Sequence, residues 1–297
     1  MSEDKKNYSI GIDIGGTKML AILFDLETKE LVADYKLATP NNNLDKFLIM
    51  LWALVDPLIE RAKKDKANIK VIGVGFPGIV DRPTNDNTDG KISKCPNLEI
   101  LNEVSLGKII FEKYNVPVLL DNDANCFLRA ELTSGAGTKV ANALGVTLGT
   151  GIGGAVSINR EIFQGVHGSA GEIGHTIIDV VENEPQTLEE IYHNLTQANP
   201  QMVADEAYEG DRLAEIVYEE IGKLLGIALA NMVNLFDPEI IILGGGVMQS
   251  SDLFMKEVKK NLKEEILSPK LKKIKVVPAK LKHGGAIGAA LLESSNK

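Results

Sequence analysis

Residues 144–158 read LGVTLGTGIGGAVSI and place a glycine-rich turn between two apolar segments. Apolar runs of this length beside turn residues predict a β-strand on each side of the turn. Within the turn, Gly149, Thr150 and Gly151 let backbone N–H groups approach an anion, because glycine has no Cβ to stand in the way. This stretch therefore predicts a β-hairpin whose turn binds phosphate.

The segment that follows adds polar groups of a different kind. Residues 168–175 read GSAGEIGH, so that the carboxylate of Glu172 and the imidazole of His175 lie three positions apart. Together with the hairpin, they predict phosphate chemistry beside side chains that hold a polar ligand.

A second hairpin has the same layout. Residues 10–23, IGIDIGGTKMLAIL, repeat it 134 residues earlier, with Asp13 opposite Thr147. Asp13, Thr17 and Lys18 are residue types that serve a magnesium–phosphate group, although an ordinary hairpin with a solvated lysine is the alternative. A repeated hairpin on this scale predicts two similar domains that face one cleft. Neither turn fits GxxxxGK[ST] or a GxGxxG that opens a helix, which excludes P-loop and Rossmann sites.

The junction DNDAN at 121–125 stands between a predicted strand over 116–121 and a predicted helix over 126–134. Such junctions are typical places for functional groups, although Asn and Asp are also preferred helix caps. A single cap does not need both the carboxamide of Asn122 and the carboxylate of Asp123, and this favours a functional role for the pair.

Two loops carry weaker signals. Gly78 lies in PGIVD at 77–81, directly after a buried strand, and Asn97 lies in CPNL at 95–98. Loops at strand ends are where α/β proteins keep ligand contacts. An Asn after Pro is more often a turn former, so the residues alone leave both interpretations of Asn97 open.

The rest of the chain alternates predicted strands and helices. The expected elements are a strand over 176–181, a loop over 182–186, a helix that begins with a capping box at Thr187, a long helix over 211–236, a strand over 240–243, a tight turn at Gly244–Gly246, and a final helix over 287–293. Gly222, Gly226 and Ala230 in the long helix are spaced for close helix packing.

Composition narrows the class of protein. The chain has 297 residues, 44% of them hydrophobic, and a formal net charge of -9, which argues against a nucleic-acid partner. Two cysteines, Cys95 and Cys126, are too few for a disulfide scaffold or a multi-cysteine metal site. The polar N-terminus and the absence of a membrane-spanning apolar run predict a cytoplasmic protein without membrane contact.

In combination, these motifs resemble the ROK family (repressors, open reading frames and sugar kinases), over about residues 8–293. The matching motifs, in order, are DIGGTK at 13–18, PGIVD at 77–81, PNL at 96–98, DNDAN at 121–125, GTGIGGA at 149–155, GSAGEIGH at 168–175 and GGGV at 244–247. The resemblance implies an α/β, two-domain actin-like (ribonuclease H-like) ATPase fold, with duplicated sheet domains around a central cleft that holds the active site. We expect an N-terminal domain over 1–120, completed by a C-terminal helix over 284–297, and a C-terminal domain over 121–283.

The resemblance also implies roles for individual residues. Asp123 would be the catalytic base for a sugar hydroxyl, and Asp13 would hold Mg²⁺ through water. The sugar ligands would be Asn122, Glu172, His175, Glu189, Asn97 and Gly78. The groups around ATP would be Asp13, Gly15, Gly16, Thr17, Lys18, Gly149, Thr150, Gly151, Gly245 and Gly246.

One departure from the family pattern concerns zinc. Many family members follow GEIGH with a cysteine cluster, CxCGxxGCxE, that binds a structural zinc ion. Residues 176–192, TIIDVVENEPQTLEEIY, contain no cysteine, so a thiolate zinc site is not expected. Leu188 and Glu189 still match the LE that closes the family motif, and Glu189 therefore stays a candidate sugar ligand.

The resemblance implies an ATP- and Mg²⁺-dependent kinase for the primary C6 hydroxyl of a hexose, with glucose as first choice. Kinases of N-acetylmannosamine, N-acetylglucosamine, mannose or fructose are alternatives, and polyphosphate is an alternative donor. A sugar-responsive transcriptional regulator is disfavoured, because only about nine residues precede Ile10. A non-catalytic sugar-binding protein is disfavoured by the Asn122–Asp123 pair. The expected partners are a small sugar and ATP, and family members commonly form homodimers.

Overall fold

The computed structural model describes residues 6–80 and 90–293. Asp81 of the PGIVD motif and residues 294–297 of the predicted C-terminal segment lie outside the described residues. The chain forms two compact units, one made of Met1–Thr133, Gln164–Ser169 and Leu281–Lys297, the other of Ser134–Phe163 and Ala170–Lys280. Residues 121–133, which the predicted division gave to the second domain, lie in the first unit. They continue from one of its sheet strands into a helix whose Cys126 packs against Ala289 and Leu292 of the same unit.

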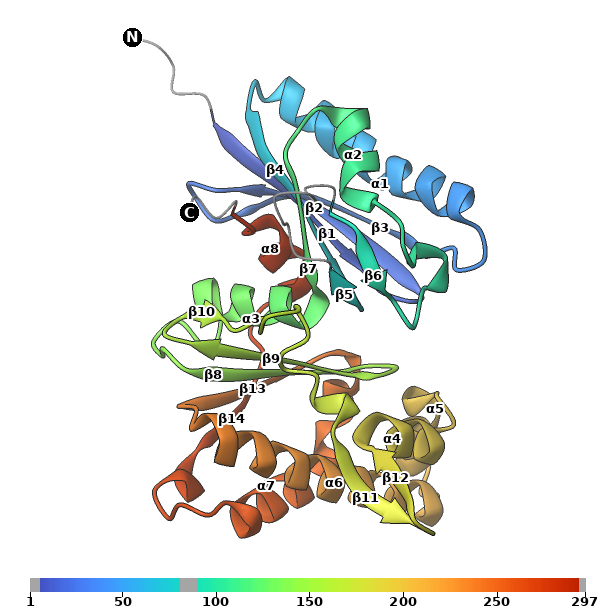
Figure 1. The fold of residues 1–297 in the computed structure, drawn as a ribbon, viewed down its shortest axis with the longest axis vertical. Coiled ribbons are helices and arrows are strands. Elements are labelled where there is room, and N and C mark those ends of the chain that lie inside the picture. Colours follow the sequence, from blue (N-terminus) through green and yellow to red (C-terminus); the bar gives the residue numbers. More distant parts are fainter. Residues whose placement is uncertain (1–5, 81–89, 294–297) are drawn as a thin grey trace. The chain divides into compact units, whose positions relative to one another are not determined.

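The first unit is built on a five-stranded sheet in the order β3-β2-β1-β4-β7 (Figure 1). Its strands are β1 (Asn7–Ile14), β2 (Lys18–Asp25), β3 (Leu31–Ala38), β4 (Asn68–Phe76) and β7 (Val118–Asn122). The first three form an antiparallel meander, and β4 and β7 run parallel to β1. A small second ladder pairs β5 (Ile79–Val80) with β6 (Ile92–Lys94).

The second unit repeats this topology strand for strand, in the order β10-β9-β8-β13-β14. Its strands are β8 (Ala143–Leu148), β9 (Ile152–Ile158), β10 (Glu161–Ile162), β13 (Ile240–Gly244) and β14 (Lys275–Pro278). Again the first three are antiparallel, and the last two run parallel to the first. The duplication predicted from the two glycine-rich hairpins is confirmed.

Helices cover both faces of the first sheet because side chains alternate along its strands. Ile10 and Ile12 pack with α1 (Leu44–Lys64), whose interior includes Pro57. On the opposite face, α8 (Gly284–Ala290) lies directly on β1 and β4. A Cβ on Gly11 would fall 1.9 Å from the carbonyl oxygen of Ala286, and one on Gly73 would fall 1.8 Å from that of Ala289. The remaining helices of this unit are η1 (Glu99–Leu101), α2 (Leu106–Tyr114) and α3 (Asp123–Ser134).

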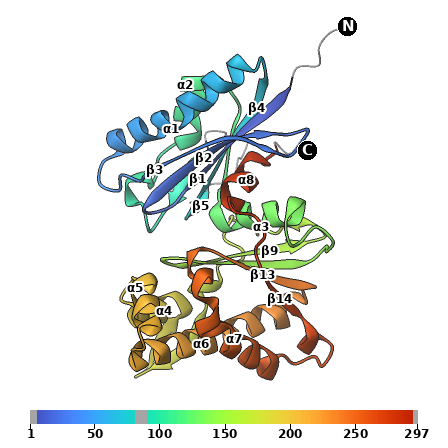
Figure 2. The same ribbon diagram turned by 180° about the vertical axis from the view of Figure 1, so that it is seen from behind.

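The core of the second unit lies between its sheet and the two longest of its helices, α6 (Arg212–Phe236) and α7 (Ser251–Glu265) (Figure 2). The small residues of α6 allow close packing as predicted, because Cβ atoms on Gly222 and Gly226 would meet the carbonyl oxygens of Phe254 and Val258 at 2.5 and 2.8 Å. The other helices are η2 (Ile173–His175), α4 (Leu188–Thr196), α5 (Pro200–Tyr208), η3 (Gly246–Ser250) and η4 (Leu271–Lys273). Within the described residues, no helix is long and apolar enough to cross a membrane.

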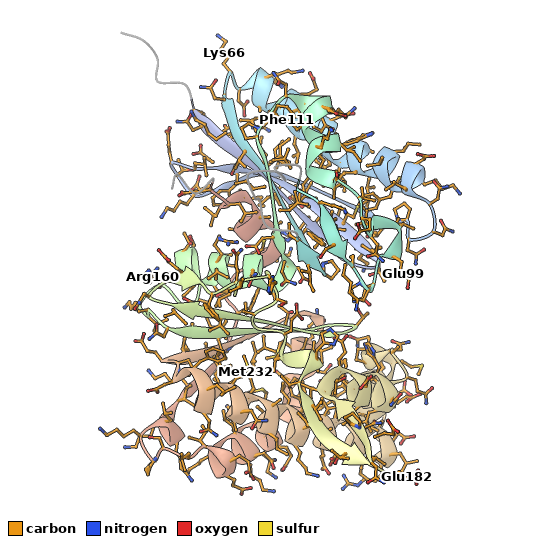
Figure 3. The ribbon with its side chains drawn as sticks, viewed as in Figure 1. Lys66, Glu99, Phe111, Arg160, Glu182 and Met232 are labelled. Atoms are coloured by element: carbon orange, nitrogen blue, oxygen red, sulfur yellow. The ribbon has the colours of Figure 1, made fainter. Side chains whose placement is uncertain are left out.

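Several elements differ from those predicted. The helix α3 begins at Asp123 rather than Cys126, and α8 spans Gly284–Ala290 rather than 287–293. The predicted loop at 182–186 is part of an antiparallel hairpin of β11 (Ile177–Val181) and β12 (Glu184–Thr187). Its tip is formed by Glu182 and Asn183, both in the left-handed region with φ of 51° and 70°, and Glu182 is labelled at that tip in Figure 3. Two consecutive positive φ values are typical of the tightest hairpin turns.

Candidate active site

The polar candidates of the first unit lie at the carboxyl ends of its parallel strands. In the sheet register, Asp13 on β1 stands beside Gly75 on β4, and Gly75 stands beside Asp121 on β7. A Cβ on Gly75 would lie 3.6 Å from the Cα of Asp123. Carboxyl ends of strands are where open α/β sheets bind ligands, and the register brings the two sequence motifs DIGGTK and DNDAN to this edge.

Asp13 carries a carboxylate with a strongly raised pKa at this edge. Its pKa is raised from 3.8 to about 7, chiefly by burial and also by the negative charge of Asp123, while Lys36 opposes the shift. Its carboxylate lies against the start of α8, since a Cβ on Gly285 would fall 2.7 Å from Oδ2 of Asp13. Two carboxylates that repel each other in a partly buried place favour either a shared proton or a bound cation.

The turn that follows Asp13 is held by hydrogen bonds to its backbone. Gly15 N–H donates to the carbonyl of Lys18 at 2.9 Å, and the Thr39 hydroxyl donates to the carbonyl of Gly15 at 2.7 Å. Thr17 and Lys18 are exposed. Asn97 lies beside this turn, because a Cβ on Gly16 would be 3.7 Å from the carbonyl oxygen of Asn97. Within the first unit, the predicted phosphate turn and one predicted sugar ligand are therefore neighbours.

Asn122 is the cap of α3. Its side-chain oxygen accepts from the N–H groups of Ala124 at 2.8 Å and Asn125 at 3.3 Å, and its Nδ2 donates to the carbonyl of Gly78 at 3.3 Å. The alternative cap role weighed for Asn122 is thus present in the structure, and the cap also ties Gly78 to the junction. Asp123 follows in the first turn of the helix, half-buried, with Oδ1 accepting from the N–H of Ala124 at 2.8 Å.

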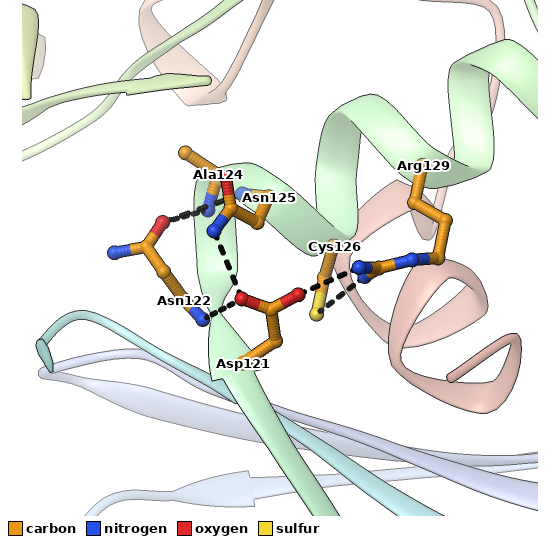
Figure 4. Close-up of polar contacts among 6 residues, drawn as sticks. All are labelled: Asp121, Asn122, Ala124, Asn125, Cys126 and Arg129. Carbon is orange, nitrogen blue, oxygen red and sulfur yellow. Dashed lines mark hydrogen bonds and ion pairs between the residues drawn. The ribbon is translucent and has the colours of Figure 1, made fainter. Parts of the chain in front are cut away.

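A buried ion pair supports the same junction (Figure 4). Oδ2 of Asp121 accepts from the guanidinium of Arg129 at 2.7 Å, and Oδ1 accepts from Nδ2 of Asn125 at 2.9 Å and from the N–H of Asn122 at 2.8 Å. The side chain of Asp121 is only 4% exposed. Since one carboxylate joins the end of β7 to two turns of α3, the backbone that carries Asn122 and Asp123 is fixed on both sides.

The two cysteines are buried and not joined in a disulfide. Burial raises the pKa of Cys95 to about 12 and holds the pKa of Cys126 well above its usual range, so both are neutral thiols at physiological pH. Within residues 6–80 and 90–293, no group of three or more His, Cys, Asp or Glu side chains is arranged to hold a metal ion.

In the second unit, the turn at Gly149–Gly151 is held from one side by α4. The N–H of Gly149 donates to the carbonyl of Gly151 at 2.9 Å, which closes the turn. The Tyr192 hydroxyl donates to the carbonyl of Gly149 at 2.8 Å, and Nε2 of His193 lies 2.7 Å from the carbonyl oxygen of Thr150. Thr150 itself is exposed.

Glu189 also contacts this turn. Its Oε2 accepts from the N–H of Ile152 at 2.6 Å. A Cβ on Gly151 would fall 2.5 Å from the same oxygen, and one on Gly174 would fall 3.4 Å from it. Glu189 therefore lies between the GTG motif and the GEIGH motif, and both glycines leave room for its carboxylate.

The glycines after β13 lie next to the same hairpin. Gly244 pairs with Thr147 in the sheet, and Gly245 has a φ of 91°. A Cβ on Gly245 would fall 2.1 Å from the carbonyl oxygen of Leu148, so only glycine fits there. Gly246 is exposed. The second unit thus places Gly245 and Gly246, two of the residues expected around ATP, beside its predicted phosphate turn.

Of the predicted pair, Glu172 directly precedes the short helix η2 and His175 is its last residue. Glu172 is half-buried and His175 is exposed. The carbonyl of Glu172 accepts from the N–H of His175 at 3.2 Å, and the Thr176 hydroxyl donates to the carbonyl of Ile173 at 2.7 Å. The GEIGH segment is thus a tight turn that leads into the β11–β12 hairpin.

Sequence reasoning missed the residues that hold the candidates in place. They are Thr39, Asp121 in its buried ion pair, Arg129, Tyr192 and His193. For the last two a signal existed, because Glu189, Tyr192 and His193 have the i, i+3, i+4 spacing that puts side chains on one face of a helix. For Thr39 and Arg129 the contacts depend on the tertiary structure.

In chemical terms, the first unit offers a half-buried carboxylate, a second carboxylate suited to a hydrated cation, and a glycine turn with Thr17 and Lys18. The second unit offers a glycine turn with backbone N–H groups and a hydroxyl, a pair of exposed glycines, and a Glu/His pair. These are the kinds of group that phosphoryl transfer requires, since it depends on positioning and on stabilisation of negative charge.

The sequence and the structure of this chain are similar to those of known sugar kinases and to the sequence of a sugar-linked repressor. A glucokinase from Halalkalibacterium halodurans is 30% identical over 290 residues, covering 86% of this chain and 84% of that protein. A xylose repressor from Caldicellulosiruptor bescii is 27% identical, covering 92% of this chain and 74% of the repressor. The crystal structure of a ROK family glucokinase from Streptomyces griseus, in complex with glucose and AMPPNP, has a TM-score of 0.77 at 25% identity, over 95% of this chain and 98% of that chain.

The duplicated sheets and their helices therefore match the actin-like ATPase fold of ROK sugar kinases, as the resemblance implied. Residues 9–295 match the ROK family over almost the whole chain. Relatives that share this likeness include both kinases and repressors. With this coverage and the fold in agreement, the chain belongs to the ROK family.

Proposed function

We propose that the protein is an ATP-dependent sugar kinase that phosphorylates the primary C6 hydroxyl of a hexose, with Asp123 as the general base. The observation that carries the proposal is the pair of carboxylates, Asp13 and Asp123, at one sheet edge, where burial and mutual repulsion raise the pKa of Asp13 to about 7. A base and a cation-holding carboxylate are the two acidic groups that this reaction needs.

In the proposed reaction, the sugar hydroxyl oxygen attacks the γ-phosphorus and the bond from that phosphorus to the bridging oxygen of ADP breaks. The proton of the hydroxyl passes to a carboxylate oxygen of Asp123. The cap at Asn122 and the ion pair at Asp121 hold Asp123 in place while this happens. Because the transition state is loose, the positions of these groups matter more than strong nucleophilic activation.

The residues present fit Mg²⁺. The carboxylate of Asp13 stands beside a second carboxylate in a partly buried place, and a hydrated cation would compensate the repulsion that raises its pKa. When bound, Mg²⁺ would neutralise charge on the phosphate oxygens. Asp13 would hold it through water, and Thr17, Lys18, Thr150 and Gly151 would contact the phosphates.

For the sugar, the proposed ligands are Asn122, Glu172, His175, Glu189, Asn97 and Gly78. Glucose is the first choice because GEIGH followed by Glu189 suits a pyranose with equatorial hydroxyls. N-acetylmannosamine, N-acetylglucosamine, mannose and fructose are alternative substrates, and polyphosphate is an alternative donor. A panel of these sugars with ATP and Mg²⁺, read by coupled ADP release, ranks them, and substitution of polyphosphate for ATP tests the donor.

Replacement of Asp123 tests the assigned base. We expect Asp123→Ala and Asp123→Asn to lower kcat by about 10²- to 10⁴-fold, because a positioned base contributes that much to proton transfer. Asp34→Asn, an acid-to-amide change at an exposed site on β3, serves as the matched control and should keep wild-type turnover. Full turnover in both Asp123 variants would show that another group takes the proton.

A sugar-responsive DNA-binding role is the second candidate, and the similarity to the xylose repressor favours it. A gel-shift assay at moderate salt, with and without each sugar, decides between the two. Specific retention of DNA that a sugar releases, together with no ADP release in the panel, would replace the kinase proposal. The homodimer implied by the resemblance and the cytoplasmic location stay predictions.

A further inference from the structure

Two side chains of α4 form hydrogen bonds with backbone carbonyl groups of the Gly149–Gly151 turn. Tyr192 donates to the carbonyl oxygen of Gly149 at 2.8 Å, and Nε2 of His193 lies 2.7 Å from that of Thr150. The carbonyl of Thr150 can only accept, so Nε2 of His193 carries the hydrogen in this contact. The Tyr192 side chain is buried, 1% exposed, and burial raises its pKa, which keeps the hydroxyl a neutral donor.

These contacts fix the direction of two backbone N–H groups. In a planar trans peptide, the C=O of one residue and the N–H of the next point in opposite directions. The carbonyls of Gly149 and Thr150 both point towards α4, so the N–H groups of Thr150 and Gly151 both point away from it. Consecutive N–H groups that point the same way form a concave anion site.

The other amides of the turn are already used. Gly149 N–H donates to the carbonyl of Gly151, and Ile152 N–H donates to Glu189. Within the part of the chain that the structure describes, the N–H groups of Thr150 and Gly151 are the two in this turn that donate no hydrogen bond to protein atoms. They are therefore available to a ligand, and Thr150 is exposed.

We propose that Tyr192 and His193 are positioning residues that aim the Thr150 and Gly151 amides at a phosphate group of the nucleotide. This inference rests on the proposed kinase function and names the part of the chain that organises the second phosphate turn. Neither side chain touches the nucleotide. Each acts through the peptide group that it holds.

The test uses Tyr192→Phe, which removes only a hydroxyl, and His193→Leu, which removes the donor. We expect each to raise the KM for ATP and the Kd for AMPPNP roughly 3- to 10-fold, the effect of one hydrogen bond, with the KM for the sugar within twofold of wild type. His193→Gln keeps an N–H donor and should restore binding to within twofold. Tyr208→Phe removes a tyrosine hydrogen bond of 2.7 Å to Asp252 in the same unit and should change neither value.

A residue-resolved readout accompanies the kinetics. In the ¹⁵N–¹H spectrum of the labelled protein, AMPPNP with Mg²⁺ should shift the amide resonances of Thr150 and Gly151 in the wild type, and less so in the Tyr192→Phe/His193→Leu double variant at equal concentration. Unchanged nucleotide affinity in folded variants, equal losses in His193→Gln and His193→Leu, or AMPPNP binding that leaves both amides unshifted would each overturn the inference.

The two proposals fail differently. A wild-type protein that binds AMPPNP at these amides but phosphorylates no sugar refutes the kinase function and keeps the positioning role. If the wild type phosphorylates a sugar but the Tyr192 and His193 variants bind nucleotide as tightly as the wild type, the kinase function stands and the positioning role is refuted. A wild-type protein that does not bind AMPPNP at all refutes both.

Discussion

At the scale of single residues, the contact between Asp121 and Arg129 joins a nearly buried carboxylate to an arginine whose side chain is 20% exposed. Replacing one partner leaves the other charge without its counter-ion where water is scarce. We expect Arg129→Met to lower the free energy of unfolding by about 3 kcal/mol, measured by urea denaturation with an unchanged slope against denaturant. The double variant Asp121→Asn/Arg129→Met should lose less, because no buried charge remains.

An exposed ion pair of the same length provides the control for this experiment. Arg212 and Glu215 are also 2.7 Å apart, with side chains 67% and 39% exposed. Arg212→Met should cost less than about 1 kcal/mol, as surface pairs do. Equal losses in the two single variants would mean that the Asp121 pair does not gain from its burial.

The raised pKa of Asp13 leads us to expect an unusual dependence of protein stability on pH. Its pKa in the folded protein is about 7, above the ordinary 3.8 that it has in an unfolded chain, chiefly because it is buried. The folded state therefore holds this proton more tightly, and the stability that Asp13 contributes is full below pH 4 and is lost as the pH rises through 7. Without Mg²⁺ or nucleotide, Asp13→Asn should be more stable than wild type at pH 8, on the order of 2 kcal/mol.

Thermal melts of wild type and Asp13→Asn between pH 4 and pH 8 test this directly, with Asp34→Asn as the exposed control. The difference in melting temperature should close as the pH falls towards 4. A difference that stays constant with pH, or a wild type that is the more stable protein at pH 8, would show that ionised Asp13 is not destabilising in the fold.

At the scale of elements, the contact of α8 with the first sheet depends on glycine. A Cβ on Gly73 would come within 1.8 Å of the carbonyl oxygen of Ala289, which is backbone and has to move with its helix. We expect Gly73→Ala to lower the free energy of unfolding by about 2–3 kcal/mol, as overpacking does. Chemical denaturation of the purified variant measures it.

Gly149→Ala is the matched change for stability, since a Cβ there would have no heavy atom within 4 Å. It should shift the free energy of unfolding by less than about 0.5 kcal/mol, the usual range for changes that disturb no packing. If Gly73→Ala changes the free energy of unfolding as little as Gly149→Ala does, α8 can shift away from the sheet at little cost.

The elements that sequence patterns predicted well are those with strong local signals. The hairpins at both glycine turns alternate apolar strands with unmistakable turn residues, and α6 has regular spacing over its 25 residues. The strand β12 (Glu184–Thr187) was missed because residues 182–186, Glu-Asn-Glu-Pro-Gln, are polar and loop-like in composition. The start of α3 was misplaced because Asp123 serves both as a candidate base and as a good first-turn residue, and local sequence does not separate the two.

At the scale of the whole molecule, the repeat of one short hairpin motif predicted the duplicated architecture, and the two sheets agree in strand order and direction. The motifs did not predict which residues cluster within each unit, and the position of Gly245 beside the Gly149 turn comes from the structure. The contact of Arg129 with Asp121 was beyond the reach of sequence reasoning, because it forms only in the folded chain. For Tyr192 and His193, the helical spacing indicated a shared face but not the turn that this face contacts. Tyr192 likewise contacts Gly149, which is 43 positions away in the chain, only in the folded structure.

The place of α8 in the chain has a consequence for biosynthesis. Residues 284–290 cover the face of the first sheet on which Gly11 and Gly73 have no side chains. They are nevertheless translated after every strand of both sheets. On the ribosome, the second unit has its complete sequence before the first can bury that face. We therefore expect the first unit, although most of it is translated first, to complete its fold after the second unit.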